Sequence, residues 1–581
     1  MAQFPLIDQA SLVMIPGAYK EGKIYSQLPT DGSGDFTFTR GTDTATRVNE
    51  NGLIEKERAN LLLQSNSFDT TWSAVSGTIT SGQSGYDGTN NAWLLSRTAA
   101  GGSVRQSVSL SNVQTTSVYA KAGSLNWMAF VGGGSNTAYF DLQNGSLGTV
   151  SGAVIEAKIE SVGTDGWYRC SITQDVSLTE VRIYPALGNF DLSANGSIYI
   201  QDAQLEQGLV ATDYIETTTV PVYAGLTDNM PRLDYSGGAS CPALLLEPQR
   251  FNAIDSSEYG GAWSAINANI TKTENATTSP EGVNNAVKLE GLTTSSANQI
   301  VNFGTTSLNG VNVVGKTYTA SVYLKPVNAG DVGTDIVLSI QRTSGDYEGF
   351  NVTAEITSAD WKRYDLTYTF TGEGAANQIG ANFKILRDGG TSIDDIYIWG
   401  VQLEEGSFAT SYIPTYGSAV TRIAESALRS TLNLSKSDFT LFVEFEFYGV
   451  EAGDEQRFYI SRGVDNDSAI LGIKNGTQIQ MTRQSGGVTL FNDTLGAQFS
   501  AGNNYKYLGK WSSGDNKSFL NGVQKTSNTT TYADFTTDIT HLNLTGSQPD
   551  GAMLDYGLKV KQVLYFPTAL TDTECIALTT I

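Results

Sequence analysis

The chain has 581 residues, which is enough for about three to five domains of ordinary size. It carries 59 acidic and 36 basic side chains, a formal net charge of −23. This excludes a broad nucleic-acid interface, since phosphate binding needs a basic surface. With a single histidine, His541, Ser-His-Asp or Cys-His catalysis and histidine-rich zinc sites are nearly excluded.

The composition favours an all-β fold with many turns. Aromatic residues make up 10% of the chain, and 61 glycines accompany only 13 prolines. No apolar run reaches the ~18 residues that would span a bilayer, so we expect no membrane insertion. Three distant cysteines, Cys170, Cys241 and Cys575, lack metal or disulfide spacing and are expected to be free thiols.

The first 57 residues read as a separate N-terminal attachment segment. Two strands are expected at 36–40 and 45–48, with a tight turn at Asn51-Gly52. The segment is too short to bury a large core of its own. We therefore expect residues 1–57 to pack on a neighbouring subunit or on an anchoring protein.

An internal duplication follows this segment. The stretch 198–208, IYIQDAQLEQG, returns as 396–406, IYIWGVQLEEG, at an offset of 396 − 198 = 198. Other motifs recur in the same order with drifting offsets, which indicates two homologous domains with loops of different length. The predicted domains span 58–220 and 245–422, joined by a linker at 221–244.

Both copies read as β-sandwiches of the jelly-roll kind. Within 318–325, residues alternate with a period of two, and turn-forming clusters separate such runs. Tryptophans recur at matching positions of the two copies, which predicts shared core packing. These are Trp72 with Trp263, and Trp167 with Trp361.

The pattern changes after residue 422. A linker is expected at 423–436, with room for one short helix, followed by a third sandwich at 437–581. Within it, Asn521-Gly522 predicts a type I′ hairpin turn. Thr571-Asp572-Thr573-Glu574 predicts a capping box that opens a terminal helix.

Several of these segments resemble virion proteins of tailed phages. The likeness rests on 36–55, on Pro231–Tyr235, on the two Gln-Leu-Glu closings and on Ala419–Arg422. In that family such segments bracket jelly rolls similar to carbohydrate-binding modules. The C-terminal piece resembles concanavalin A-like or laminin G-like domains, through Leu520–Gly522 and 566–574.

The resemblance implies a fibre or spike component on the virion surface, made in the host cytoplasm. It implies attachment to other virion proteins through the N-terminal segment, a homotrimeric state and binding of host surface glycans. A passive capsid decoration protein that binds no sugar is the main alternative. A glycan-cleaving enzyme is the third, because a glycosidase needs only two suitably spaced carboxylates; no pair stands out, and we expect no enzyme activity.

Sugar binding requires flat aromatic side chains combined with a few polar groups. Tyr505, Tyr507 and Trp511 share one face of an expected strand and would form a stacking platform if that face points outward. The candidates outside the repeated framework are Tyr505, Tyr507, Trp511, Arg483, Tyr86, Trp93, Tyr139 and Tyr347.

No cofactor is required by the sequence, but a structural calcium ion is possible, since calcium takes oxygen ligands. Carbohydrate-binding modules of this kind often hold one between an acidic residue near the first strand and another in the last. The matching positions here are Asp69 and Asp202, whereas the second copy has Gly400 in place of Asp202.

Overall fold

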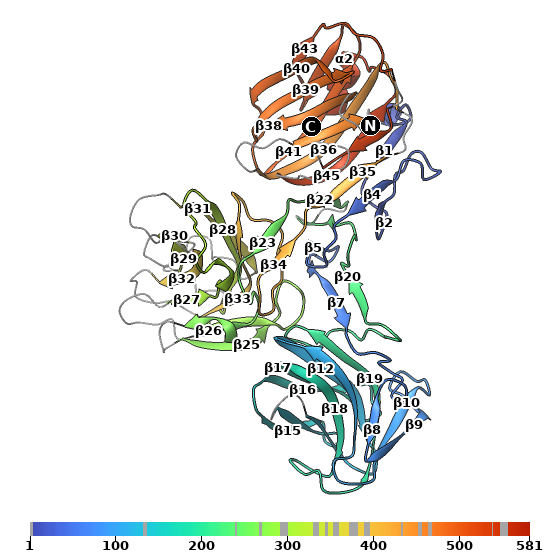
Figure 1. The fold of residues 1–581 in the computed structure, drawn as a ribbon, viewed down its shortest axis with the longest axis vertical. Coiled ribbons are helices and arrows are strands. Elements are labelled where there is room, and N and C mark those ends of the chain that lie inside the picture. The colour runs from blue at the N-terminus through green and yellow to red at the C-terminus, as the bar shows by residue number, and fades with distance from the viewer. Residues whose placement is uncertain are drawn as a thin grey trace.

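The computed structural model describes the chain apart from residues 1–3, 132–135, 237, 239–240, 266–269, 291–299, 329–335, 343–346, 352–359, 371–380, 388–394, 431–433, 451–455, 463–466, 537–538 and 546–555. The described residues form three β-sandwiches, arranged as three lobes around a central strand-rich segment (Figure 1). Among them, no helix is long and apolar enough to cross a membrane.

The first jelly roll packs two antiparallel sheets face to face. The strand order of the first sheet is β16 (Val154–Val162), β17 (Trp167–Asp175), β12 (Val113–Ala122), β19 (Gly196–Gln207), β10 (Ala92–Arg97) and β9 (Gly77–Gln83). The other runs β15 (Ser146–Ser151), β14 (Thr137–Asp141), β13 (Trp127–Val131), β18 (Leu178–Ala186), β11 (Ser103–Leu110) and β8 (Ser73–Val75).

The second jelly roll repeats this order. One sheet runs β31 (Lys362–Thr369), β28 (Thr317–Pro326), β33 (Ile396–Glu405), β26 (Ala286–Glu290) and β25 (Thr271–Thr277). The other runs β30 (Tyr347–Asn351), β29 (Ile336–Arg342), β32 (Ala381–Arg387), β27 (Ile300–Phe303) and β24 (Ser264–Ala265). Short 3₁₀ turns lie at Gly260–Ala262 and Thr306–Leu308. The shared order is what the duplication predicts.

The C-terminal sandwich is built from both ends of the chain. Its first sheet runs β21 (Leu233–Asp234), β22 (Ala243–Leu246), β45 (Tyr556–Phe566), β36 (Phe439–Val450), β41 (Asn503–Trp511), β42 (Asn516–Leu520) and β43 (Val523–Asn528), with β1 (Leu12–Met14) beside β45. Its second runs β2 (Tyr19–Lys20), β3 (Lys23–Ile24), β4 (Phe36–Thr39), β35 (Ser426–Arg429), β44 (His541–Asn543), β37 (Gln456–Ser461), β38 (Ser468–Lys474), β39 (Gln478–Ser485) and β40 (Val488–Ala497).

This arrangement corrects the prediction of a separate attachment segment. Leu12 lies opposite Tyr565, and Phe38 lies opposite Ala427. Phe36 and Phe38 are fully buried in the C-terminal core, so the segment finds its missing core in its own chain. The expected linkers are also partly strand: β21 and β35 belong to this sandwich, and no helix forms at 426–429.

Three short strand pairs connect the lobes: β5 (Arg47–Val48) with β6 (Ile54–Glu55), β7 (Glu57–Asn60) with β20 (Val222–Gly225), and β23 (Arg250–Asn252) with β34 (Val420–Arg422). A helix α1 spans Phe4–Ile7. The terminal helix α2 spans Asp572–Thr579 and has the predicted capping box between Thr571 and Glu574. Asn521 and Gly522 have φ values of 49° and 79°, as the predicted type I′ turn requires.

Buried charges hold the meeting point of the lobes. Arg232 contacts Glu247 at 2.7 Å and Glu425 at 2.6 Å, and Arg422 contacts Glu247 at 2.8 Å. All four side chains are at most 1% exposed. Removing one partner from such a cluster leaves an uncompensated buried charge, which is strongly destabilising. The lobes are therefore joined by specific pairs as well as by chain connections.

Candidate functional site

The repeated sequence motifs form a buried hydrogen-bond network that closes each jelly roll. In the first copy, Glu206 accepts hydrogen bonds from the Gln204 side chain at 2.7 Å and from the Thr212 backbone at 2.9 Å. In the second, Glu404 accepts from Gln402 at 2.7 Å and from the Thr410 backbone at 2.8 Å. The repeated motifs therefore stabilise the fold of each domain. Their side chains are engaged with one another, so we look for a ligand site at other residues.

Three of the four repeated tryptophans are buried, as predicted. Trp72 and Trp263 are 5% and 2% exposed, and each indole N–H donates to a backbone carbonyl a few residues before it, at Gln64 and Ser256. Trp167 is also buried. Its counterpart Trp361 is only partly buried and donates to the Thr278 carbonyl.

The predicted platform in the C-terminal sandwich is wrong. Tyr507 and Trp511 are 0% exposed and Tyr505 is 6% exposed, all within the core. They lie on β41, whose shared face points inward. Arg483 is likewise fully buried, with its guanidinium 3.8 Å from the centre of the Phe535 ring. A sugar in solution cannot stack on these side chains.

Tyr86 is explained by packing in the first jelly roll. Its ring stacks on Tyr119 with centroids 4.1 Å apart, and its hydroxyl donates to Asp202 at 2.7 Å. Trp93 is 8% exposed and belongs to the core. The backbone of Tyr347 lies in β30 opposite Gln341, but its side chain is outside the described residues.

The two predicted calcium ligands, Asp202 and Asp69, lie in different environments. Asp202 is 5% exposed, and burial raises its pKa to about 6 against the opposing hydrogen bond from Tyr86. Asp69 lies on an exposed turn and accepts from the Thr70 hydroxyl at 3.2 Å. Within the described part of the chain, no group of three or more His, Cys, Asp or Glu side chains is arranged to hold a metal ion. Calcium binding stays a prediction.

Tyr139 is the candidate that lies in an aromatic cluster on the outer side of a sheet, where Tyr139 and Tyr184 are 5% and 7% exposed and Phe190 is 67% exposed. On β13, Met128 and Phe130 face the core, so Trp127 and Ala129 face outward. Ala129 lies between Tyr139 on β14 and Tyr184 on β18. We call this outer surface of the sheet the aromatic face; it comprises Trp127, Ala129, Val131, Tyr139, Tyr184, Ala186, Phe190 and Leu192.

A turn brings one more aromatic ring to this face. Asp191 N donates to Gly188 O at 3.1 Å, which closes a turn with Phe190 at its third position. Phe190 has a φ of 58° and is 67% exposed, with its ring 5.7 Å from that of Tyr139. This left-handed conformation favours glycine or asparagine, and a phenylalanine adopts it at a cost of ~1–2 kcal/mol.

Polar groups border the aromatic face. Arg182 donates to the Tyr184 hydroxyl at 2.8 Å and pairs with Glu180 at 2.8 Å. Burial and the nearby charge of Asp191 raise the pKa of Tyr139, so its hydroxyl stays protonated at neutral pH. Ala129, Tyr139 and Tyr184 are at most 7% exposed, so a sugar would reach this face through the exposed ring of Phe190.

The second jelly roll has other residues at the matching positions. Arg105 lies opposite Ser73 and Arg182, while Asn302 lies opposite Ser264 and Lys384. This register aligns the row Tyr139–Ala129–Tyr184 with the row Asn351–Val337–Leu386. The aromatic residues are therefore specific to the first copy.

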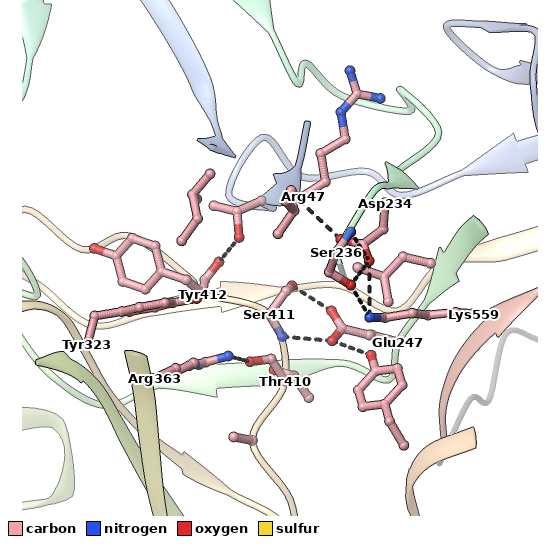
Figure 2. A pocket seen from close by; sticks show the side chains of 16 residues that line it. Arg47, Asp234, Ser236, Glu247, Tyr323, Arg363, Thr410, Ser411, Tyr412 and Lys559 are labelled. Atoms are coloured by element: carbon pink, nitrogen blue, oxygen red, sulfur yellow. Dashed lines mark hydrogen bonds and ion pairs between the residues drawn. The ribbon is translucent and has the colours of Figure 1, made fainter. Parts of the chain in front are cut away.

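A pocket lies where the lobes meet. This junction pocket, of about 230 Å³, is lined by the N-terminal segment, the second jelly roll and the C-terminal sandwich (Figure 2). Sequence reasoning missed it because its lining comes from residues as distant as Arg47 and Lys559. Sequence reasoning also missed Trp127, Tyr184 and Phe190. The apolar residues on both faces of β13 were the available signal for the aromatic face.

No family model matches the chain, and no curated protein matches it. Among solved structures, the CBM40 of a Ruminococcus gnavus IT-sialidase bound to α2,3-sialyllactose is 18% identical, over 25% of this chain and 84% of its own, with a TM-score of 0.23. The tandem CBM22 domains of Paenibacillus barcinonensis Xyn10C are 12% identical, over 60% and 96%, with a TM-score of 0.20. A Trypanosoma rangeli sialidase in complex with 2,3-difluorosialic acid is 10% identical, over 93% and 97%, with a TM-score of 0.22. At these scores the likenesses carry no argument about function.

Proposed function

We propose that this protein is a glycan-binding surface protein whose first jelly roll carries the sugar site. The observation that carries the proposal is the exposed ring of Phe190, held beside Tyr139 at a left-handed backbone position. Strain of this kind persists where the surrounding structure enforces it, and it gathers at binding sites. An exposed aromatic residue contributes little to folding, so its cost is offset by contact with a ligand.

The substitution Phe190→Asn separates binding from packing. Asparagine tolerates the left-handed region, so we expect the free energy of unfolding to stay unchanged or to rise by about 1 kcal/mol. Binding to the glycans that the parent protein selects on an array should fall at least tenfold. The control Phe190→Tyr keeps the aromatic ring and should keep binding. A clear loss of stability with unchanged glycan binding would assign Phe190 to packing alone.

The proposed setting is the surface of a tailed-phage virion, as a homotrimeric fibre or spike component that contacts the host. Support comes from the sequence segments that resemble such proteins. The N-terminal strands are committed to the C-terminal sandwich, so attachment through a free N-terminal arm is not part of the proposal. Labelled antibody on imaged virions tests the location, and sedimentation of the purified protein tests the trimer.

A further inference from the structure

The junction pocket differs in its chemistry from the aromatic face. Its volume of about 230 Å³ corresponds to roughly eight water molecules at their share of liquid volume, ~30 Å³ each. The apolar part of its lining includes Ile54 and Leu245, and polar groups from Ser236, Tyr323 and Lys559 converge on it (Figure 2). Clefts between domains with this mixture of lining are common ligand sites.

The carboxylates of the pocket are already occupied. Glu247 accepts from the Ser411 backbone at 2.7 Å and from the Ser411 hydroxyl at 2.6 Å, and also from the Tyr448 hydroxyl. Although burial opposes it, Arg422 and Arg232 hold the pKa of Glu247 well below its ordinary value. The second carboxylate, Asp234, accepts from the Val48 backbone at 3.1 Å. Neither group has to be met by a ligand.

Three cations line the same space: Arg47, Arg363 and Lys559. Arg47 pairs with Glu55 at 2.8 Å, and Lys559 pairs with Asp234 at 3.1 Å. Arg363 donates to the Thr410 carbonyl at 2.6 Å and to a serine hydroxyl, and no carboxylate lies within ion-pair distance of it among the described residues. The positive charge of Arg363 is therefore not neutralised by a carboxylate of the protein, although the chain as a whole has a net charge of −23. A bound anion could neutralise it.

Tyr323 adds an unused donor. The Arg363 guanidinium lies 5.5 Å from the centre of the Tyr323 ring. Burial raises the pKa of Tyr323, so the phenol stays protonated. Within the described part of the chain, its hydroxyl has no hydrogen-bond partner and is not among the fully buried oxygens. A hydroxyl that lines a pocket and has no protein partner is available to a ligand.

We propose that the junction pocket binds a monosaccharide-sized carboxylic acid, of the uronic acid class. Arg363 and Lys559 attract the carboxylate, Tyr323 donates a hydrogen bond, and the apolar lining covers the C–H face of the ring. Because the pocket spans three parts of the chain, an acid bound there stabilises their arrangement. This site is independent of the aromatic face.

Calorimetric titration with sodium glucuronate, with glucose as the neutral analogue, tests the proposal on the full chain. We expect glucuronate to bind at least tenfold more tightly than glucose and to raise the melting temperature. The affinity should fall as NaCl is raised. A disaccharide that ends in glucuronate distinguishes a glycan terminus from a free acid, and binding of either one supports the proposal. Equal affinity for glucuronate and glucose, or binding of none of these probes, overturns it.

Two variants place the ligand in the pocket. Tyr323→Phe removes only the free hydroxyl and should weaken glucuronate binding about tenfold. Ala409→Leu fills the pocket without removing a charge and should abolish binding while the protein still unfolds cooperatively. The control Lys561→Met removes a half-buried cation that lies two residues from Lys559 in β45 and outside the pocket lining, and it should bind as the parent does. Unchanged binding in both pocket variants would place the acid elsewhere and overturn the assignment.

Discussion

The two jelly rolls share a buried hydrogen-bond network and differ in the residues of one sheet. Both keep the Gln-Glu-Thr network, with the same atoms bonded in each copy. At the matching positions of the sheet, the row Tyr139–Ala129–Tyr184 of the first copy is Asn351–Val337–Leu386 in the second. After the duplication, buried polar groups had to stay paired, whereas these rows diverged. The residues of these rows, and not the network, therefore distinguish the two copies.

The copies also differ in how the N-terminal segment reaches them. In the second copy, Lys56 enters a buried site and contacts Glu258 at 2.9 Å and Glu281 at 2.9 Å. Burial alone would lower the pKa of Lys56, but the two carboxylates outweigh it and raise that pKa. The position of Glu258 corresponds to Asn66 in the first copy, because the preceding serines, Ser65 and Ser257, make matching contacts with Tyr214 and Tyr412.

The largest expected effect comes from breaking this one-sided contact. Lys56→Met removes the cation that pairs with Glu258 and leaves Glu281 with Arg58 at 3.4 Å, and it should destabilise the second jelly roll by about 3–5 kcal/mol. The first jelly roll should be unaffected, which hydrogen exchange resolved by region can measure. Adding Glu258→Gln and Glu281→Gln to the variant should restore much of the loss. Equal loss of protection in both copies would contradict the asymmetry.

A smaller effect should be equal in the two copies. Glu206→Gln and Glu404→Gln each replace the carboxylate oxygen that accepts from the Thr212 or Thr410 hydroxyl with an amide NH2. The hydroxyl must then turn to accept, and the charge that strengthens the other hydrogen bonds of the network is lost. Each should cost its own domain about 1–3 kcal/mol. The losses should add in the double variant, since the sites lie in different domains. Denaturant unfolding of the single and double variants measures this, and a strong departure from additivity would mean that the copies do not behave as separate domains.

The smallest effect is confined to Asp202, for which the second copy has Gly400. Because burial raises the pKa of Asp202 to about 6, its contribution favours folding below pH ~4, where the carboxyl is protonated in both states. That contribution is lost as pH rises to about 6. Asp202→Asn should remove this slope and add about 1 kcal/mol at pH 7.

The same variant tests the calcium prediction. If Asp202 binds calcium, the parent protein should melt at a higher temperature with calcium than with a chelator, and Asp202→Asn should lose that difference. Melting curves at pH 5 and pH 7, each with calcium and with chelator, separate the two explanations. A parent protein that is insensitive to chelator at both pH values would leave Asp202 as a buried, hydrogen-bonded acid.

Local patterns predicted much of the fold. The alternation within 318–325 gave the strand β28, Asn521-Gly522 gave the hairpin, and Thr571–Glu574 gave the terminal helix. Pairing over long distances was not predictable in this way: nothing in Leu12–Met14 specifies that its partner is β45. The prediction of a platform at Tyr507 and Trp511 was wrong for a related reason. The alternation of residues along a strand tells which side chains share a face, but not which face is buried against the other sheet.

The site was less predictable than the fold. Tyr139 was identified from its residue type alone. The position of the Phe190 ring depends on a turn whose geometry could not be predicted from the sequence around it. Sequence patterns could not reveal the junction pocket, because its lining is assembled by the packing of three separate parts of the chain.

The pairing of the two chain ends sets an order for folding during synthesis. Each jelly roll is contiguous in sequence and can fold as it leaves the ribosome. Strand β1 cannot pair until β45 has been synthesised, because Leu12 lies opposite Tyr565. At 5–20 residues per second, completing the chain takes about 30–120 s. Over that time the early apolar strands, with Phe36 and Phe38, have no sheet to join. Chains that stop before residue 556 therefore expose unpaired strand edges, and we expect them to aggregate and not to accumulate as soluble fragments.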